Sequence, residues 1–367
     1  GVNPASIKTA DDLAALPILD KQTVRDNVEL LKPKSLEQIP HITEHTSGST
    51  GSSLIFPQSV DNVRDLWAAF WRFWNRIGIE YGTRYADFGS RTIVPPNQRK
   101  PPFWRECQPL FQIKFSAFHG NDENYMAYFK AINDYGLTWI HGYPSCIMPF
   151  ASFVAQNGLT FDKPIKAVTA SAENLYGYQR SIIEKAFGVQ PHALYGLTEA
   201  VACIGEDADH DYIVDEDYSA VEFIECGDYS RIIGSNLTNF AFPLLRYDTG
   251  DLAITTDRLK NGRRVIERID GRTGELLSLP DGGKVGALSA LFTESATIKE
   301  AQIHQLEDYS VEISFVPLSD NYTEDIAEAE KRFRDRTKGM LPVSFKRVDG
   351  IERTKRGKLR YVVSDIK

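Results

Sequence analysis

A run of small polar residues near the N-terminus has the composition of an anion-binding loop. Residues 45–53 read HTSGSTGSS, so every residue after His45 is Ser, Thr or Gly. Such a run has almost no apolar surface to bury, and ordering its backbone costs conformational entropy. It is therefore either a flexible linker or a loop whose backbone N–H groups and hydroxyls bind phosphate. It is not a Walker A motif, because Ser52 follows Gly51 where that motif has Lys.

Three later segments carry charged side chains beside glycine. Tyr195–Glu199 (YGLTE) follows a predicted strand, and Arg246–Asp251 (RYDTGD) is predicted to lie at a turn between strands. Residues 353–360 (RTKRGKLR) lie near the C-terminal end. Together with TSGSTG at 46–51, these segments occur in the order and spacing that are typical of the adenylate-forming superfamily.

The chain therefore resembles acyl-CoA synthetases and adenylation domains, most of all the phenylacetate–coenzyme A ligase branch, which includes capsule-associated members. Segments 11–27 and 171–174 (SAEN) extend the resemblance to nearly the whole chain. It implies that ATP activates a small aromatic or apolar carboxylic acid to an acyl-adenylate, and that coenzyme A then accepts the acyl group. An amide-forming ligase that uses an amine, and a nucleotide-binding protein without turnover, remain alternatives.

The resemblance implies roles for a set of nucleotide-binding residues. The phosphates, the adenine side and the ribose would be held by Thr46, Ser47, Gly48, Ser49, Thr50, Gly51, Ala172, Glu173, Tyr195, Gly196, Asp251 and Arg272. Asp251 would accept hydrogen bonds from the ribose hydroxyls, because a carboxylate is purely an acceptor. Arg272 would add a ribose or hinge contact. An ordinary turn residue is the alternative for Asp251.

Three residues are expected to act on the reacting groups. Glu199 would ligate Mg²⁺, since hard cations prefer carboxylate oxygen, and Thr198 would hydrogen-bond a phosphate oxygen. Lys358 would bridge the acid and the α-phosphate while charge builds. To reach the phosphates, a C-terminal lobe carrying Lys358 must close over the larger domain. A solvated surface lysine is the alternative.

The acid pocket is expected in segments 117–120, 141–145, 169–172 and the turn after Tyr195. Its candidate lining residues are His119, His141, Tyr143 and Ser171. A histidine of the core or of the surface, without a contact to the acid, is an alternative of at least equal weight for both.

Two further groups of polar residues are weaker candidates. Cys203, His210 and Cys226 could form a structural zinc site, although their spacing fits no standard zinc pattern. The acidic stretch 206–218 is expected to be a solvated loop. It is not a calcium loop, because Asp211 occupies the sixth position, where such a loop needs glycine.

The chain departs from the family pattern at two places. Many members carry Pro and then Lys or Thr after the glycine loop, whereas this chain has Ser52, Ser53 and Leu54. Phosphate binding would then depend on hydroxyls and backbone alone. The hinge segment 273–286 reads TGELLSLPDGGKVG, and Glu275 would stand in for the hinge acid. Coenzyme A is therefore the default acceptor, with an amine or a carrier protein still open.

Hydrophobic periodicity predicts a layered α/β fold. Expected helices are 59–77, 121–135, 146–157, 176–187 and 324–338; expected strands include 166–170, 191–195, 311–317 and 343–348. The strand–helix alternation predicts a large α/β domain (1–270) with parallel-rich sheets and a smaller antiparallel sheet after about residue 212. Residues 271–367 are predicted to form a small, mobile α+β lobe.

Composition limits the classes of partner. The apolar content is 42%, which predicts a packed core, and the net charge of −8 argues against a nucleic-acid binder. No apolar run has the roughly 20 residues that span a bilayer, and no signal peptide is recognised. Four scattered cysteines favour reduced thiols and a cytoplasmic location. The chain begins with Gly1, so N-terminal sequence is expected to be missing; a homodimer is an option that the sequence leaves open.

Overall fold

The computed structural model describes residues 2–46, 54–89, 92–272, 276–286, 288–292, 295, 297–353 and 359–366. The chain divides into two compact units. One unit comprises Gly1–Tyr81 and Leu194–Gly271, and the other comprises Gly82–Ala193 and Arg272–Lys367. A separate domain at 271–367 stays a prediction.

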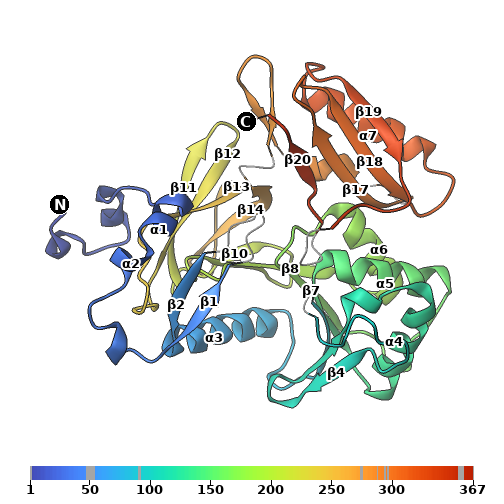
Figure 1. The fold of residues 1–367 in the computed structure, drawn as a ribbon, viewed down its shortest axis with the longest axis horizontal. Helices are drawn as coiled ribbons and strands as arrows, with labels where there is room; N and C mark the ends of the chain where they lie inside the picture. Colours follow the sequence, from blue (N-terminus) through green and yellow to red (C-terminus); the bar gives the residue numbers. More distant parts are fainter. Residues whose placement is uncertain are drawn as a thin grey trace. The chain divides into compact units, whose positions relative to one another are not determined.

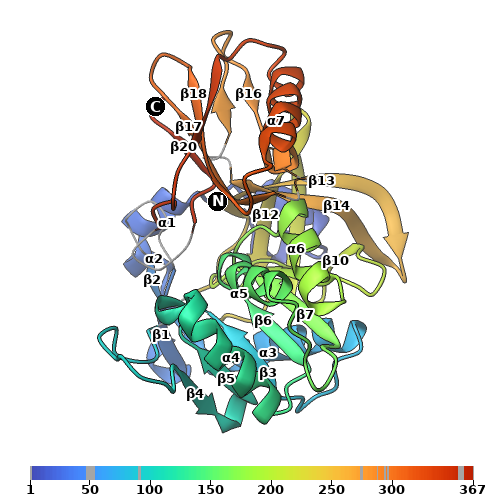
Figure 2. The ribbon, with the colours of Figure 1, turned by 90° about the vertical axis from the view of Figure 1, so that its right-hand side faces the viewer.

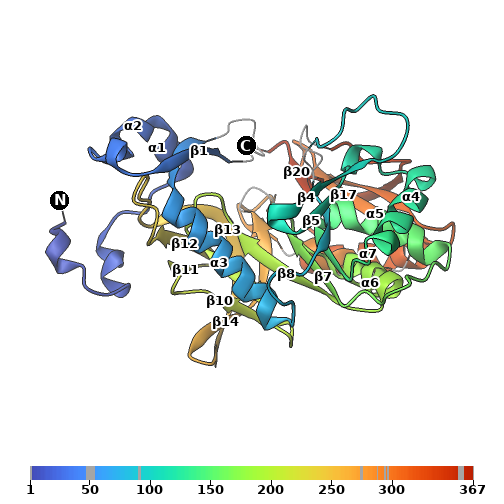
Figure 3. The ribbon, with the colours of Figure 1, turned by 90° about the horizontal axis from the view of Figure 1, so that it is seen from below.

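The first unit begins with short helices and a two-stranded ladder that runs into a long helix. The elements are α1 (Lys21–Asp26), α2 (Val28–Leu31), β1 (His41–His45), β2 (Ile55–Ser59) and α3 (Val60–Arg76). The strands β1 and β2 are antiparallel, and β2 leads directly into α3 (Figure 3). Ser59 caps α3 by accepting a hydrogen bond from the backbone N–H of Asn62 at 3.2 Å. The predicted helix is confirmed; its fully buried aromatic residues are Phe73 and Trp74.

The rest of the first unit is a sheet with the strand order β11-β12-β13-β14-β10-β9-β8 (Figure 1). Its strands are β8 (Pro191–Gly196), β9 (Cys203–Glu206), β10 (Tyr212–Val214), β11 (Ser219–Cys226), β12 (Tyr229–Asn236), β13 (Tyr247–Lys260) and β14 (Arg263–Arg272). Neighbours β11–β12, β12–β13, β14–β10, β10–β9 and β9–β8 are antiparallel. The antiparallel pairing was expected for the strands after about residue 212.

The RYDTGD segment is not a turn between strands, which corrects the expectation from sequence. Its residues from Tyr247 onward belong to β13. The register against β12 shifts in this stretch, and Gly250 has φ +75°, so the strand is bulged. The hydroxyl of Thr249 donates to the carbonyl of Ile232 at 2.8 Å and fixes the bulge. A bulge re-aims the side chains that follow it, here Asp251.

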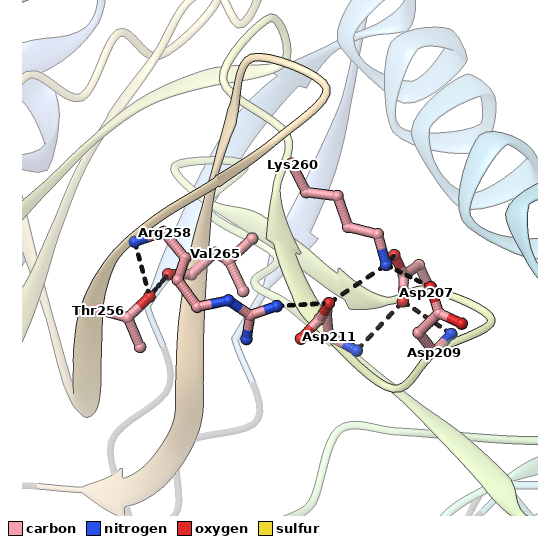
Figure 4. A network of polar contacts seen from close by, with 7 residues as sticks. All are labelled: Asp207, Asp209, Asp211, Thr256, Arg258, Lys260 and Val265. Atoms are coloured by element: carbon pink, nitrogen blue, oxygen red, sulfur yellow. Dashed lines mark hydrogen bonds and ion pairs between the residues drawn. The ribbon is translucent and has the colours of Figure 1, made fainter.

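The acidic stretch 206–218 is not a solvated loop. Asp207, Asp209 and Asp211 all bind the ammonium group of Lys260 on β13, at 2.5, 2.6 and 3.2 Å (Figure 4). Asp215 is completely buried and contacts three arginines, namely Arg72, Arg76 and Arg263. Burial raises the pKa of Asp215, and the arginines oppose that shift. The residues of this stretch therefore attach the loop to α3 and to the β13–β14 hairpin.

The second unit contains the parallel strands that the sequence predicts. Its first part holds β3 (Tyr85–Phe88), β4 (Trp104–Cys107), β5 (Gln112–Phe115), β6 (Trp139–Gly142), β7 (Ala167–Ser171), α4 (Asp122–Asp134), α5 (Pro144–Gln156) and α6 (Gly177–Phe187). Strands β5, β3, β6 and β7 are parallel neighbours, with β4 antiparallel at the edge. The helices cover one face of this sheet (Figure 2), where Phe88, Ile140 and Phe150 belong to the core.

The described residues of 272–367 include a four-stranded sheet in the order β19-β18-β17-β20, a two-stranded sheet β15-β16 and the helix α7. The elements are β15 (Leu277–Ser278), β16 (Lys284–Val285), β17 (Ile298–Gln305), β18 (Val311–Pro317), α7 (Thr323–Arg336), β19 (Val343–Arg347) and β20 (Val362–Ser364). The expected α+β character is confirmed. The rings of Tyr176 and Tyr361 lie 4.4 Å apart, so this sheet shares an apolar core with the first part of the unit.

Within the described residues, no helix has both the length and the apolar character needed to cross a lipid bilayer.

Candidate functional site

One apolar cluster in the first unit joins three of the polar segments singled out from the sequence. Its buried members include Leu54, which follows the Ser/Thr/Gly run, Val201, which follows Glu199, and Tyr247 of the RYDTGD segment. Val24 from α1 belongs to the same cluster. Because these side chains pack on one another, the polar residues beside them are held at one location in this unit.

The two described residues that bound the Ser/Thr/Gly run, Thr46 and Leu54, are hydrogen-bonded to each other. The backbone N–H of Thr46 donates to the carbonyl of Leu54 at 2.9 Å, and the N–H of Leu54 donates to the Thr46 hydroxyl at 3.0 Å. Thr46 is buried, so this pair begins and ends the loop inside the unit. The other predicted phosphate-binding residues lie outside the described residues; they are Ser47, Gly48, Ser49, Thr50 and Gly51.

Tyr195 and Asp251 form a partly buried hydrogen bond. The Tyr195 hydroxyl donates to Oδ2 of Asp251 at 2.8 Å, and Asp251 is 6% exposed. Burial, together with the Asp251 charge, raises the pKa of Tyr195 well above its ordinary value. The phenol therefore remains a donor at neutral pH and orients the carboxylate. The backbone N–H of Asp251 donates to Thr249 Oγ1 at 3.1 Å, so the bulge also fixes this residue.

Glu199 is a second buried carboxylate in this unit. The Tyr247 hydroxyl donates to its Oε1 atom at 3.1 Å, and Nζ of Lys21 lies 3.8 Å from the same oxygen. Gly234 on β12 permits the close approach of the nearby Val201, because a Cβ there would lie 2.1 Å from the carbonyl oxygen of Val201. A carboxylate is a suitable ligand for Mg²⁺, because this ion prefers hard oxygen ligands. Glu199 would thus hold the metal, whose charge would offset that of the phosphates.

Three loops of the second unit lie at the carboxyl ends of its parallel strands, where α/β sheets commonly bind ligands. They are residues 116–120 after β5, 143–145 after β6 and 171–173 after β7. Tyr143 is the residue before α5, and Ser171 ends β7. Glu173 ties two loops together, because its carboxylate accepts from the backbone N–H and the hydroxyl of Ser145, both at 3.0 Å. Ala172 has φ +66°, an uncommon conformation for a residue with a Cβ.

His141 lies in a row of polar residues that crosses four parallel strands. The registers align Lys114, Asp87, His141 and Thr169 on β5, β3, β6 and β7. Nδ1 of His141 is 2.8 Å from the hydroxyl of Thr169, which also accepts from Trp139 Nε1 at 2.9 Å. Burial lowers the pKa of His141, and the nearby Asp87 charge opposes this shift. The imidazole is therefore neutral at physiological pH.

His119 lies on the loop after β5 and is 7% exposed. Its Nδ1 atom is 2.8 Å from the Ser116 hydroxyl, and its ring stacks on Phe103 with centroids 4.7 Å apart. In the described part of the chain, its Nε2 atom has no hydrogen-bond partner. One ring nitrogen is thus used by the fold, while the other is a polar atom buried without a protein partner.

The C-terminal candidates are only partly described. Lys358 lies outside the described residues, but Arg353 and Leu359, which flank its segment, form an antiparallel bridge. Arg272 is the last residue of β14, and its side chain lies outside the described part. Gly196 ends β8, and Thr198 is partly exposed in the segment between Tyr195 and Glu199.

The proposed zinc ligands do not come together. Cys203 is buried whereas Cys226 is exposed at the end of β11, and neither cysteine joins a group of three ligating side chains among the described residues. Burial, with the nearby Asp215 charge, raises the pKa of the Cys203 thiol, which disfavours the thiolate that zinc needs. His210 instead contacts Glu206, with 3.2 Å between Nδ1 and Oε2.

Sequence reasoning missed two residues of the site. Tyr247 lies inside the RYDTGD motif, which was the only signal for it, and its contact with Glu199 was not foreseen. Lys21 lies in the N-terminal segment, and its spacing from Glu199 along the chain gives no sign of their proximity.

A family model and several curated proteins are similar to this chain. A family model described as the CapK C-terminal domain matches residues 277–365. Protein CapK of Staphylococcus aureus is 28% identical over 374 residues, which cover 98% of this chain and 82% of CapK. Phenylacetate-coenzyme A ligase of Pseudomonas putida is 22% identical over 312 residues, which cover 76% of this chain and 65% of that enzyme. Indoleacetate–lysine synthetase of Pseudomonas savastanoi is 34% identical over 130 residues, which cover 35% of this chain and 32% of the synthetase.

Solved structures show the same fold. The 2-hydroxyisobutyryl-CoA ligase in its postadenylation state aligns with a TM-score of 0.70 and 16% identity, over 99% of this chain and 83% of that chain. An anthranilate CoA ligase bound to anthranoyl-AMP aligns with a TM-score of 0.62 and 12% identity, over 86% of this chain and 65% of that chain. The chain therefore has the fold of the adenylate-forming ligases, and its expected resemblance to that superfamily, capsule-associated members included, is confirmed.

Proposed function

We propose that this chain, which resembles the adenylate-forming superfamily in sequence and fold, converts a small aromatic or apolar carboxylic acid and MgATP to an acyl-adenylate. It then transfers the acyl group to the thiol of coenzyme A. The observation that carries the proposal is the apolar cluster of the first unit. That cluster contains Leu54 after the Ser/Thr/Gly run, Val201 near Glu199 and Tyr247 near Asp251. It therefore brings the three polar segments together, as binding of one triphosphate would require.

In the first unit, each proposed role follows from the chemistry of the side chain. Asp251 would accept hydrogen bonds from the ribose hydroxyls, oriented by the hydroxyl of Tyr195. The five residues after Thr46 would bind the phosphates through hydroxyls and backbone N–H groups, whereas Thr46 would use its hydroxyl, because its own N–H donates to Leu54. Thr198 would donate to a phosphate oxygen, and Glu199 would ligate Mg²⁺.

In the second unit, the loops at the carboxyl ends of β5, β6 and β7 would bind the acid and the adenine. The buried Nε2 of His119, which has no hydrogen-bond partner among the described residues, would offer the acid a polar atom, and His141, Tyr143 and Ser171 would line its binding site further. Glu173 holds the third loop to Ser145, so the adenine side would be rigid before the nucleotide arrives. Lys358 would act on the acid and the α-phosphate, and Arg272 would add a ribose or hinge contact.

Amide formation is a second candidate for the acyl-transfer step. It is supported by the 34% identity to a synthetase named for joining indoleacetate to lysine. An amine and a thiol both attack an acyl-adenylate with release of AMP, so the first half-reaction is common to both candidates.

The first half-reaction is tested by exchange of labelled pyrophosphate into ATP against a panel of carboxylic acids. Positive acids are then incubated with coenzyme A or with amines, and the products are weighed by mass spectrometry. Lys358→Ala should still bind ATP but lose ~10²–10³ in exchange rate, because it lacks a preorganised cation. Lys355→Ala is the matched control. Exchange that no acid stimulates would refute the proposal, and full exchange in Lys358→Ala would refute the role of that lysine.

A further inference from the structure

A lysine from the N-terminal segment lies beside the carboxylate that is proposed to hold Mg²⁺. Lys21 is the first residue of α1, and its Nζ atom is 3.8 Å from Oε1 of Glu199. The Glu199 side chain is 6% exposed, whereas that of Lys21 is 32% exposed. The ammonium group thus lies between a buried carboxylate and solvent, on a stem that is flexible enough to reorient.

Tertiary contacts, rather than the short helix, set the position of Lys21. The N–H of Leu19 donates to the carbonyl of Arg246 at 2.9 Å, and its carbonyl accepts from the N–H of Asp248 at 2.9 Å. The guanidinium of Arg246 reaches back to the carbonyl of Ala14 at 3.1 Å and binds Glu222 at 2.9 Å. The segment that delivers Lys21 is therefore attached to the strand that carries Asp251.

The expected phosphate loop itself supplies no cation. Residues 46–53 contain Ser, Thr and Gly but neither Lys nor Arg. Hydroxyls and backbone N–H groups can orient a triphosphate, but they carry no net charge to attract one. An ammonium group is a compact point charge that binds phosphate oxygens well. Lys21 has that chemistry and is already held beside Glu199.

We propose that Lys21 binds the β- or γ-phosphate of ATP and supplies the positive charge that the Ser/Thr/Gly loop lacks. The inference rests on the proposed function, since it takes Glu199 as the metal end of the nucleotide site and the Tyr195–Asp251 pair as its ribose end. Lys21 lies at the metal end, so it serves the terminal phosphates and not the nucleoside. Before the nucleotide binds, the same ammonium balances the charge of Glu199.

The test measures nucleotide binding by calorimetry, without any acid substrate. We expect Lys21→Met to weaken binding of MgATP by ~10-fold or more, the value of a charged hydrogen bond, and to leave binding of AMP unchanged. Lys21→Arg, which keeps the charge, should retain most of the ATP affinity. The matched control is Lys32→Met on the same segment, where the lysine pairs with Glu29 at 2.6 Å and both affinities should remain as in the wild type.

Unchanged ATP affinity in Lys21→Met would overturn the inference. An equal loss of ATP and AMP binding would also overturn it, because that result marks a structural role for the segment. Where Lys21→Met folds poorly, a well-folded Lys21→Arg that fails to bind ATP would overturn it as well. Failure of the proposed function is seen separately, as a wild-type protein without acid-dependent pyrophosphate exchange, since the Lys21 measurements need no turnover.

Discussion

Replacing Asp251 by Ala should abolish the selection of ribose over deoxyribose. Asp251 is 6% exposed and is held by the Tyr195 hydroxyl at 2.8 Å, so a ribose hydroxyl would meet a fixed, poorly hydrated carboxylate. A hydrogen bond to such a charged group contributes ~1.5–3 kcal/mol. Since each ~1.4 kcal/mol is a factor of ten, the wild type should prefer ATP over 2′-deoxyATP by about 10- to 150-fold. Asp251→Ala should lose that preference.

The assay is competition binding of the two nucleotides to the wild type, Asp251→Ala and Tyr195→Phe. Tyr195→Phe should retain part of the preference, because the carboxylate remains but is no longer oriented by the phenol. The raised pKa of Tyr195 keeps the phenol protonated at neutral and mildly alkaline pH, so the effect of Tyr195→Phe should not change across that range. Asp257→Ala, on the exposed part of the same strand, is the control.

A folded Asp251→Ala protein that keeps the wild-type ratio of ATP to 2′-deoxyATP affinity would refute this reasoning. The carboxylate would then be structural, as a residue of the β13 bulge, and the ribose would have to bind elsewhere.

Two further predictions concern stability. Burial lowers the pKa of His141 below its unfolded value of 6.5, so the unfolded state binds more protons and stability is lost as the pH falls below that value. When the pH falls from about 7.5 to about 5.5, the melting temperature of His141→Gln should therefore fall less than that of the wild type. His41→Gln, at an exposed histidine, is the control. Equal losses in the wild type and in His141→Gln would contradict this. Asp215→Ala removes a fully buried carboxylate that contacts Arg72, Arg76 and Arg263. It should lower the free energy of unfolding, measured in urea, by about 3 kcal/mol. This value is at the low end for a broken buried ion pair, because the arginines are partly exposed. Asp217→Ala, where the carboxylate is 57% exposed, should cost far less, and similar costs for the two variants would show that burial does not decide the effect.

Much of the fold could be predicted from local patterns. The apolar spacing of 59–77 predicts α3 because helical neighbours recur at three and four residues, and the short apolar runs at 166–170 and 191–195 predict β7 and β8 for the corresponding reason in strands. The segments YGLTE and RYDTGD pointed to Glu199 and Asp251, because both segments resemble motifs of the adenylate-forming superfamily. These features depend on residues that are close together along the chain.

Other features depended on the tertiary structure. The bulge that aims Asp251, the three arginines around Asp215 and the contact of Lys21 with Glu199 each join residues that lie far apart in sequence. No local periodicity records such a pair, since either side chain alone is an ordinary polar residue of a loop or helix. Amino-acid type thus determined which groups can do chemistry, and long-range packing decided which of them meet, because only burial in a shared core makes a distant pair of charges fixed neighbours.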